Sequence, residues 1–302
     1  MFPNINISFP LSTSPLSVLS SESRLFWLFT KRDLIVTVVP CSLFMLVSLS
    51  TLSQPLAYIS NFLLGLVYFA LFIYQFTVSN QIHGLEEDKI DKPDRPIPSG
   101  LVSLDEANVR YVVLVLAYLT LGTLLNVFWW TILWVLVTYF HNVQGWDKKW
   151  ATKNILAMGL GVLSMLGAAW CIIGNLTITS YTWIIAIALW IGFTSAIQDF
   201  RDQEGDALNG RKTLPLLVGD VKARKIMIAI YAVVMVFIIN VFIFLSTSAP
   251  VITYAICALL AIWHIVMMVR LWKLRTPAAD KTTYNALCLL YCVLLLSSFC
   301  IF

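Results

Sequence analysis

Charged residues are scarce in this chain. Of its 302 residues, Asp, Glu, Lys and Arg make up 12%, whereas 59% are hydrophobic and the formal net charge is +4. Soluble domains carry roughly twice that share of charge, and the mean hydropathy here is +0.83. This composition excludes an ordinary soluble protein, and so small a positive charge gives no support to nucleic-acid binding.

The chain also lacks the cysteine spacing of a metal site and the basic start of a secretory signal. Its six cysteines lie within apolar stretches, where free cysteine behaves as a small buried side chain. Residues 1–23 are rich in Ser and Pro and do not resemble a signal peptide. We expect residues 1–30 to form a loosely ordered cytoplasmic N-terminal arm and residues 31–302 to form a single transmembrane domain.

Long apolar runs are what the sequence has in abundance. A helix needs roughly 20 apolar residues to cross a bilayer. We interpret nine runs as spans: 34–52, 57–79, 105–122, 124–140, 153–173, 181–198, 225–246, 250–270 and 283–301. The predicted fold is therefore an all-α, polytopic membrane protein with about nine transmembrane helices.

The basic residues fall in alternate connections between these spans. Lys and Arg precede the first span and follow spans two, four, six and eight, whereas the other connections contain none. Because cytoplasmic connections of membrane proteins carry the excess of Lys and Arg, we place the charged side in the cytoplasm. A membrane of the endoplasmic-reticulum type is the expected location, and no obligate protein partner is inferred.

An acidic stretch follows the second predicted span. It comprises residues 80–91 (NQIHGLEEDKID), here named the first acidic segment. If the helix continues through it, Asn80, Gly84 and Asp88 share one face, while Glu87 and Asp91 belong to the adjacent ridge. One helix end would then present an amide and several carboxylates toward a common point.

A similar stretch follows the sixth predicted span. It comprises residues 198–206 (QDFRDQEGD), here named the second acidic segment, in which Asp199, Asp202 and Asp206 recur at the spacing of one helix face. Mg²⁺ prefers one or two carboxylates together with water and phosphate oxygens. Two such segments facing each other suit ions that neutralise a diphosphate. The alternative is two solvated, charge-mixed loops, and the ligand pattern of an EF-hand is absent.

A proline-rich stretch, residues 92–100 (KPDRPIPSG), follows the first acidic segment. Its three prolines exclude a helix and make a stiff connection back to the membrane. Arg95 is held on this connection, where its guanidinium can fork onto phosphate oxygens. Ser103 and Glu106 then have the spacing of a capping box at the start of the third span.

Further basic residues accompany the second acidic segment on the same side of the membrane. Arg211 and Lys212 follow it in the sequence GRKTLP at 210–215, and Lys153 begins the fifth span. We favour phosphate binding for these side chains. For Lys148 and Lys149, the requirement of membrane topology explains the positive charge equally well.

Taken together, the two acidic segments, the stretch RPIPSG at 95–100 and the stretch GRKTLP at 210–215 resemble the signatures of the UbiA superfamily of intramembrane prenyltransferases. The sequence KWATKN at 149–154 also matches and adds Asn154 to the expected set. The resemblance covers nearly the whole chain. It implies a ring of helices around a central cavity that opens sideways to lipid, in which Mg²⁺ holds an isoprenyl diphosphate at the two acidic motifs.

The first acidic segment departs from the family pattern, because Gln81 and Gly84 stand where two acidic residues are usual. Glu87 or Asp91 would supply the missing charge, and the departure resembles a branch that includes membrane-bound terpene cyclases. The implied metal ligands are Asn80, Glu87, Asp88, Asp91, Asp199, Asp202 and Asp206. The implied catalytic residues are Asp88, Asp199, Asp202 and Arg95. The implied diphosphate contacts are Lys153, Asn154, Arg211 and Lys212.

The leading functional prediction is Mg²⁺-dependent ionisation of an allylic isoprenyl diphosphate, with transfer of the isoprenyl group to an aromatic, phenol-like acceptor in secondary metabolism. A terpene cyclase, in which the cation is captured by its own chain, is the alternative, because both reactions share the ionisation step. Transport is a remote alternative, since no carboxylate or lysine lies at mid-depth in a predicted span.

Aromatic side chains can stabilise the carbocation that both reactions form. Tyr74, Trp190 and Phe193 lie within about three turns of the acidic segments and are the candidates, with ordinary helix packing as the alternative. His264 lies in the middle of the eighth span and is either a proton acceptor or a helix-packing residue.

Overall fold

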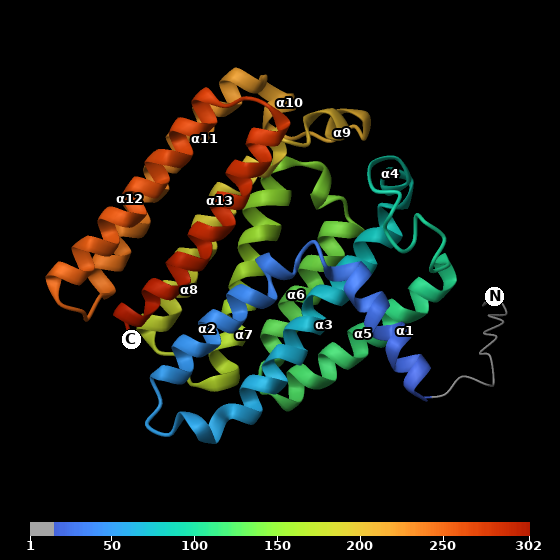
Figure 1. Cartoon of the computed structure of the whole chain (residues 1–302), viewed down its shortest axis with the longest axis horizontal. Coiled ribbons are helices and arrows are strands. Elements are labelled where there is room, and N and C mark those ends of the chain that lie inside the picture. Colours follow the sequence, from blue (N-terminus) through green and yellow to red (C-terminus); the bar gives the residue numbers. More distant parts are fainter. Residues whose placement is uncertain (1–14) are drawn as a thin grey trace.

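The computed structural model describes residues 15–302, and this part of the chain is almost entirely helical (Figure 1). Within it the only extended pairing is an isolated bridge between Lys149 and Lys212, which confirms the predicted all-α class. The longer helices are α1 (Pro15–Thr30), α2 (Val38–Ser50), α3 (Ile59–His83), α5 (Leu104–Leu124), α6 (Phe128–Asn142), α7 (Gly159–Ile173), α8 (Ile178–Thr194), α11 (Asp220–Leu245), α12 (Pro250–Lys273) and α13 (Pro277–Leu296).

Shorter elements connect these helices, mostly at one end of the molecule. Three are α-helical: α4 (Leu85–Asp91), α9 (Gln203–Leu208) and α10 (Leu214–Val218). One is a π-helix, η4 (Ala151–Met158), continuous with α7. The others are 3₁₀ turns: η1 (Leu34–Val36), η2 (Pro55–Tyr58), η3 (Trp146–Lys148), η5 (Ser195–Phe200) and η6 (Ser297–Cys300).

Seven helices in the described residues are long and apolar enough to cross a membrane, and the number is eight if α1 and α2, bent by 68° at their junction, form one broken span. The predicted count of nine is therefore not confirmed. The expected span at 124–140 corresponds to α6, whose 15 residues make a helix of about 22 Å. That is shorter than the roughly 30 Å of a hydrocarbon core.

The hairpin of α7 and α8 forms the middle of the bundle. Most residues in the apolar windows of these two spans are buried, whereas only 22% and 28% of those in α11 and α12 are. Helix α7 packs against α2, α3, α6 and α8, while α8 packs against α11 on its other side. The hairpin of α7 and α8 therefore contacts helices from both halves of the bundle. The outer helices present their apolar surface to lipid.

The expected N-terminal arm covers residues 1–30. Residues 1–14 lie outside the described part, and residues 15–30 form α1, which packs against α3. Arg110 of α5 forms a bidentate ion pair with Glu22 of α1 and donates a hydrogen bond to the Tyr74 hydroxyl at 3.0 Å. At the start of α5, the predicted capping box of Ser103 and Glu106 is confirmed.

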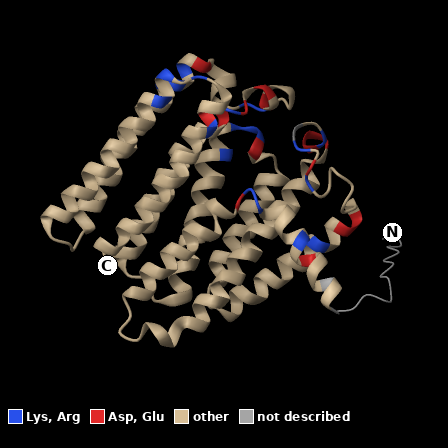
Figure 2. Cartoon of the chain, viewed as in Figure 1, with Lys and Arg blue, Asp and Glu red and all other residues tan. Residues whose placement is uncertain are grey.

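Charged residues gather mainly at one end of the bundle, around α4, α9 and α10 (Figure 2). The acidic segments and the basic residues that follow them all belong to this end. One-sided charge agrees with the alternation seen in the sequence. The assignment of this end to the cytoplasm stays a prediction.

Candidate functional site

The first acidic segment begins in α3 and ends in α4, with a helix break at Gly84 between them. The side chain of Asp88 is only 4% exposed, and its carboxylate contacts Arg95 at 2.5 Å and Lys92 at 3.5 Å. Arg95 also donates a hydrogen bond to the side-chain oxygen of Asn80 at 3.3 Å. The expected continuous helix is interrupted, yet Asn80 and Asp88 still converge on one guanidinium group.

The proline-rich connection holds Arg95 in this position. No helix forms between α4 and α5, as the prolines predict. The side-chain oxygen of Gln81 accepts a hydrogen bond from the backbone N–H of Ile97 at 3.4 Å, and Gln81 is buried. An amide at position 81 therefore joins this connection to α3, where the family pattern has a carboxylate.

The second acidic segment contains a fully buried carboxylate, Asp199. One of its oxygens accepts a hydrogen bond from the Lys153 ammonium group at 2.7 Å, and the other accepts one from the Asn154 amide at 3.0 Å. The Asn154 oxygen in turn accepts hydrogen bonds from Gln198 and Ser195. Both oxygens of Asp199 therefore have a hydrogen-bond partner, which fixes the orientation of the carboxylate.

The three aspartates of this segment do not share one helix face. The chain passes from the 3₁₀ turn η5 through residues 201–202 into α9, so the assumed α-helical spacing does not apply. Asp199 and Asp206 are buried, whereas the side chain of Asp202 is 47% exposed and pairs with its neighbour Arg201 at 3.0 Å. The expectation of a common face is wrong for Asp202.

Close backbone packing brings Lys153 and Asn154 to Asp199. Lys153 and Asn154 both lie on the π-helix η4, and π-helical turns are frequent at functional sites. Where η4 and α7 cross α8, a Cβ atom on Gly159 would lie 3.3 Å from a carbonyl oxygen, and one on Gly192 would lie 3.0 Å from another. Only glycine allows the two backbones to approach so closely.

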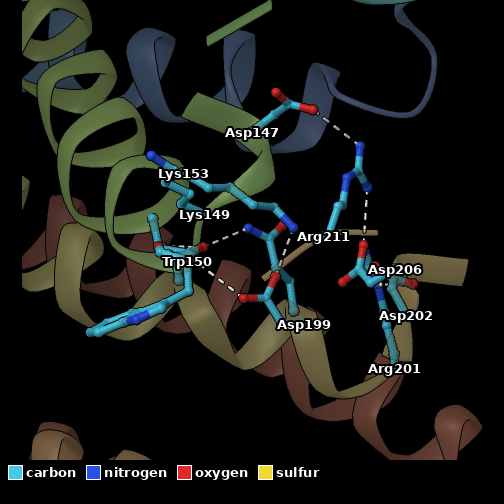
Figure 3. Close-up of polar contacts among 12 residues, drawn as sticks. Asp147, Lys149, Trp150, Lys153, Asp199, Arg201, Asp202, Asp206 and Arg211 are labelled. Atoms are coloured by element: carbon cyan, nitrogen blue, oxygen red, sulfur yellow. Dashed lines mark hydrogen bonds and ion pairs between the residues drawn. The ribbon is translucent and has the colours of Figure 1, made fainter. Parts of the chain in front are cut away.

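Arg211 joins the two acidic segments. Its guanidinium contacts Glu87 of the first segment at 2.9 Å and Asp206 of the second at 3.0 Å. It also contacts Asp147 of η3 at 3.5 Å, and Figure 3 shows the contacts with Asp147 and Asp206. Burial raises the pKa of the Glu87 carboxyl, while the charge of Arg211 acts in the opposite direction. Segments that are more than 100 positions apart in the sequence thus meet at one cation.

The connection that carries Arg211 is fixed by backbone hydrogen bonds. The N–H of Lys212 donates to the carbonyl oxygen of Lys148 at 2.7 Å, and the N–H of Trp150 donates to that of Lys212 at 3.0 Å. Lys212 contributes through its backbone, and its side chain is exposed, as are those of Lys148 and Lys149. Carboxylates are thus contacted by Arg95, Arg211, Lys153 and Asn154. The side chains of Lys148, Lys149 and Lys212 remain exposed.

Comparison with known proteins agrees with this geometry. The sequence matches the UbiA prenyltransferase family over residues 37–297. The chain belongs to the UbiA prenyltransferase family. Two relatives from Hericium erinaceus are the diterpene cyclase eriG, 33% identical over 93% of this chain and 89% of its own length, and the polyprenyl transferase eriF, 36% identical over 68% and 72%.

A solved structure shows the same UbiA fold. It is a UbiA homolog from Archaeoglobus fulgidus bound to GPP and Mg²⁺, with a TM-score of 0.64 at 16% identity. The match covers 90% of this chain and 99% of that one. The relatives of this UbiA-family chain are therefore prenyltransferases and terpene cyclases, and both classes are enzymes that the predicted ionisation step suits.

The acidic residues of this UbiA-family site suit Mg²⁺ by their chemistry. Carboxylate and amide oxygens are the ligands that Mg²⁺ prefers, and one oxygen of Asp206 is buried without a hydrogen-bond partner. Within residues 15–302, however, no three acidic, histidine or cysteine side chains are grouped as a metal site. Basic side chains lie between the carboxylates instead. Asp91 ends α4, and its side chain lies outside the described part.

The aromatic candidates lie away from the acidic segments or pack into the bundle. Tyr74 contacts Phe26 and Phe29 of α1, and Phe193 is 37% exposed on the outside of α8. The indole N–H of Trp190 donates to His264 at 2.9 Å. The other ring nitrogen of His264 bonds the carbonyl oxygen of Leu260, so both residues have packing roles.

A different set of aromatic rings leads from the first acidic segment into the bundle. Trp134 of α6 stacks on Phe72 with ring centroids 4.2 Å apart and on Phe76 at 5.1 Å, and Phe76 lies 5.4 Å from His141. Phe72 and Phe76 precede Asn80 at four-residue spacing, so they share its helix face. The four-residue spacing could have identified Phe72 and Phe76 from the sequence. Trp134 was missed because no sequence pattern links α6 to α3.

Proposed function

We propose that the protein is a membrane-bound terpene cyclase, which ionises an allylic isoprenyl diphosphate and closes the resulting cation on its own chain. The supporting observation is the junction of the two acidic segments at Arg211, together with the stacked rings of Phe72, Phe76 and Trp134 on α3 and α6. The match to the diterpene cyclase eriG over 93% of the chain favours cyclisation.

In this proposal, basic side chains at the charged end orient the diphosphate. Arg95 and Lys153 each hold a buried carboxylate and have further N–H groups that can donate to phosphate oxygens. Asn154 fixes Asp199, and Lys212 with its neighbours raises the positive potential at the entrance. Together they hold the leaving group so that the C–O bond points into the apolar interior.

The acidic residues would hold the metal. The proposed ligands are Asn80, Glu87, Asp88, Asp91, Asp199, Asp202 and Asp206. When bound, Mg²⁺ supplies positive charge that stabilises the diphosphate as a leaving group. Asp88 and Asp199 are catalytic residues in this proposal because they pair with Arg95 and Lys153, the basic side chains that would contact the diphosphate.

The rings of Phe72, Phe76 and Trp134 stabilise the carbocation after ionisation. Their faces carry negative electrostatic potential, which attracts a cation. The apolar surroundings of α3 and α6 exclude water, which would otherwise capture the cation as an alcohol. Ring closure by the substrate's own double bonds is then the remaining path.

Transfer to an aromatic, phenol-like acceptor is the second candidate, supported by the 36% identity to the polyprenyl transferase eriF. Ionisation would use the same residues, and the acceptor would enter from the bilayer. The relatives named above are enzymes, which disfavours a transporter. A cytoplasmic orientation of the acidic segments and a membrane of the endoplasmic-reticulum type belong to both versions of the proposal.

The deciding experiment incubates purified protein with Mg²⁺ and geranyl, farnesyl or geranylgeranyl diphosphate without any acceptor. We expect a cyclic hydrocarbon by gas chromatography with mass spectrometry, and no product after EDTA treatment. Product that forms only when a phenolic acceptor is added would replace cyclisation with transfer. Absence of diphosphate release under both conditions would remove the proposed function altogether.

A further inference from the structure

Arg211 contacts three carboxylates, more than any other basic residue described at the charged end. It lies between α9 and α10, and its three carboxylate partners come from α4, η3 and α9. Arg211 is 18% exposed, Glu87 15% and Asp206 1%. Salt screens an ion pair this enclosed much less than a surface pair. The guanidinium is therefore held firmly in the site, and Figure 3 shows it between Asp147 and Asp206.

Three converging carboxylates need a cation between them. Glu87, Asp147 and Asp206 would otherwise repel each other at short range. A divalent ion is one solution, and a planar guanidinium with five N–H donors is another. Here the guanidinium occupies the junction, and neither Gln81 nor Gly84 of the first segment offers a carboxylate to hold a further ion there.

The junction still has one acceptor to spare. The second oxygen of Asp206 is buried and has no hydrogen-bond partner, and Asp199 lies within electrostatic reach of Asp206. This oxygen belongs to the carboxylate that already pairs with Arg211 through its other oxygen, so a cation that binds it would be added beside Arg211 and would not replace it.

We propose that Arg211 is a built-in cation that takes the place of one divalent ion between the two acidic segments. Of the proposed metal ligands, Glu87 then stays paired with Arg211, and divalent ions are confined to the remaining ligands of the two segments, on either side of the guanidinium. The inference rests on the proposed function for the diphosphate, but the binding of ions can be measured without any substrate. It makes Arg211 a positioning residue that holds both segments in register before the substrate arrives.

The test is a titration of purified protein with Mn²⁺, followed by the electron paramagnetic resonance signal of the free ion. Arg211→Gln should bind one more ion than the wild type, or bind the same ions on the order of tenfold more tightly, because a repelling charge is gone. Arg211→Lys should show a smaller gain of about threefold, since an ammonium group keeps the repelling charge but lacks the planar fork of the guanidinium. Arg32→Gln, which breaks an exposed pair with Asp94, is the matched control and should not change Mn²⁺ binding.

A double variant sharpens the result. Arg211→Gln combined with Asp147→Asn removes one of the three carboxylates that the added ion would use, so the gain should be lost. Unchanged Mn²⁺ number and affinity in Arg211→Gln would overturn the proposal, and weaker binding of inorganic pyrophosphate in that variant would assign Arg211 to the diphosphate instead. If Arg211→Gln does not fold, Arg211→Lys decides, and wild-type Mn²⁺ affinity in it overturns the proposal.

Failure of this inference is distinguishable from failure of the proposed function. The Mn²⁺ titration contains no isoprenyl diphosphate, so its outcome is independent of turnover. A wild-type protein that releases no diphosphate contradicts the proposed function whatever the ion count. A wild-type protein that is active, with an Arg211→Gln variant whose ion binding is unchanged, contradicts only the role of Arg211.

Discussion

The two acidic segments differ in where their partners come from. Asp88 of the first segment is held by Lys92 and Arg95, both within seven positions in the sequence. Asp199 of the second is held by Lys153 and Asn154, about 45 positions away on another helix. The contacts of Asp88 are local in the sequence, whereas the contacts of Asp199 form only when α7 and α8 are packed together. Loss of the second should therefore cost more.

The largest effect is expected for Asp199→Asn. The change removes a buried carboxylate and leaves the Lys153 charge without its partner, so the site loses both a proposed metal ligand and its fixed geometry. We expect diphosphate release to fall on the order of 1,000-fold. A coupled pyrophosphate assay measures it, and a loss below tenfold would break the comparison.

Asp88→Asn should have a smaller effect. Asn80 and Glu87 remain beside it, and Arg95 keeps its hydrogen bond to Asn80. We expect a loss of about 100-fold in the same assay. If Asp88→Asn proved more damaging than Asp199→Asn, the first segment would be the dominant one, contrary to the difference in burial and partners.

The second segment also depends on an ion pair outside the site. Arg224 of α11 forms two hydrogen bonds with Asp280 of α13, at 2.9 and 2.8 Å, and stacks over Phe200 at the end of η5. Removing one partner of a buried pair costs about 3–5 kcal/mol. Asp280→Asn should therefore lower the thermal unfolding midpoint in detergent.

The same ion pair provides its own control. An Arg224→Leu, Asp280→Leu double variant removes both charges together, so it should recover most of the lost stability. A double variant as unstable as Asp280→Asn would show that the pair is not the source of the effect. Turnover should follow stability in these variants, because neither side chain contacts the proposed metal ligands.

The smallest effect is expected for Asp94→Asn in the proline-rich connection. Asp94 is exposed and pairs only with Arg32, and exposed pairs contribute little. Turnover should stay within twofold of wild type. The hydrogen bond from Arg32 lowers the pKa of Asp94, so the pair is present above the ordinary Asp range and is lost as pH falls through the lowered pKa. Turnover that depends on Asp94 near neutral pH would contradict this assignment.

Local features of the sequence predicted much of the fold and part of the site. Prolines in the stretch 92–100 and the pair of Ser103 and Glu106 act within a few residues. The sequence alone therefore predicted both the non-helical connection and the capping box of α5. The count of nine spans was not confirmed, because hydropathy does not reveal where a helix ends. The shared face of Asp199, Asp202 and Asp206 failed because 3₁₀ and turn geometry replaced the α-helical period.

Residues brought in by tertiary packing could not be predicted. Asp147 meets Arg211 only because the backbone of η3 pairs with the connection before α10. Asn142 accepts hydrogen bonds from both Asn80 and His141, although its position at the end of α6 looks like an ordinary helix end in the sequence. Arg211 lies 64 positions from Asp147 and Asn80 lies 62 positions from Asn142, beyond any periodic pattern.

The crossing of η4 and α8 gives chemical importance to two residues without side chains. An extra methyl group at Gly159 or Gly192 would push the helices apart by a few tenths of an ångström. Lys153 would then move relative to Asp199. The absence of side chains at two glycines thus sets the position of a charged group several residues away, so the geometry around Asp199 depends on steric bulk within the bundle as well as on charge.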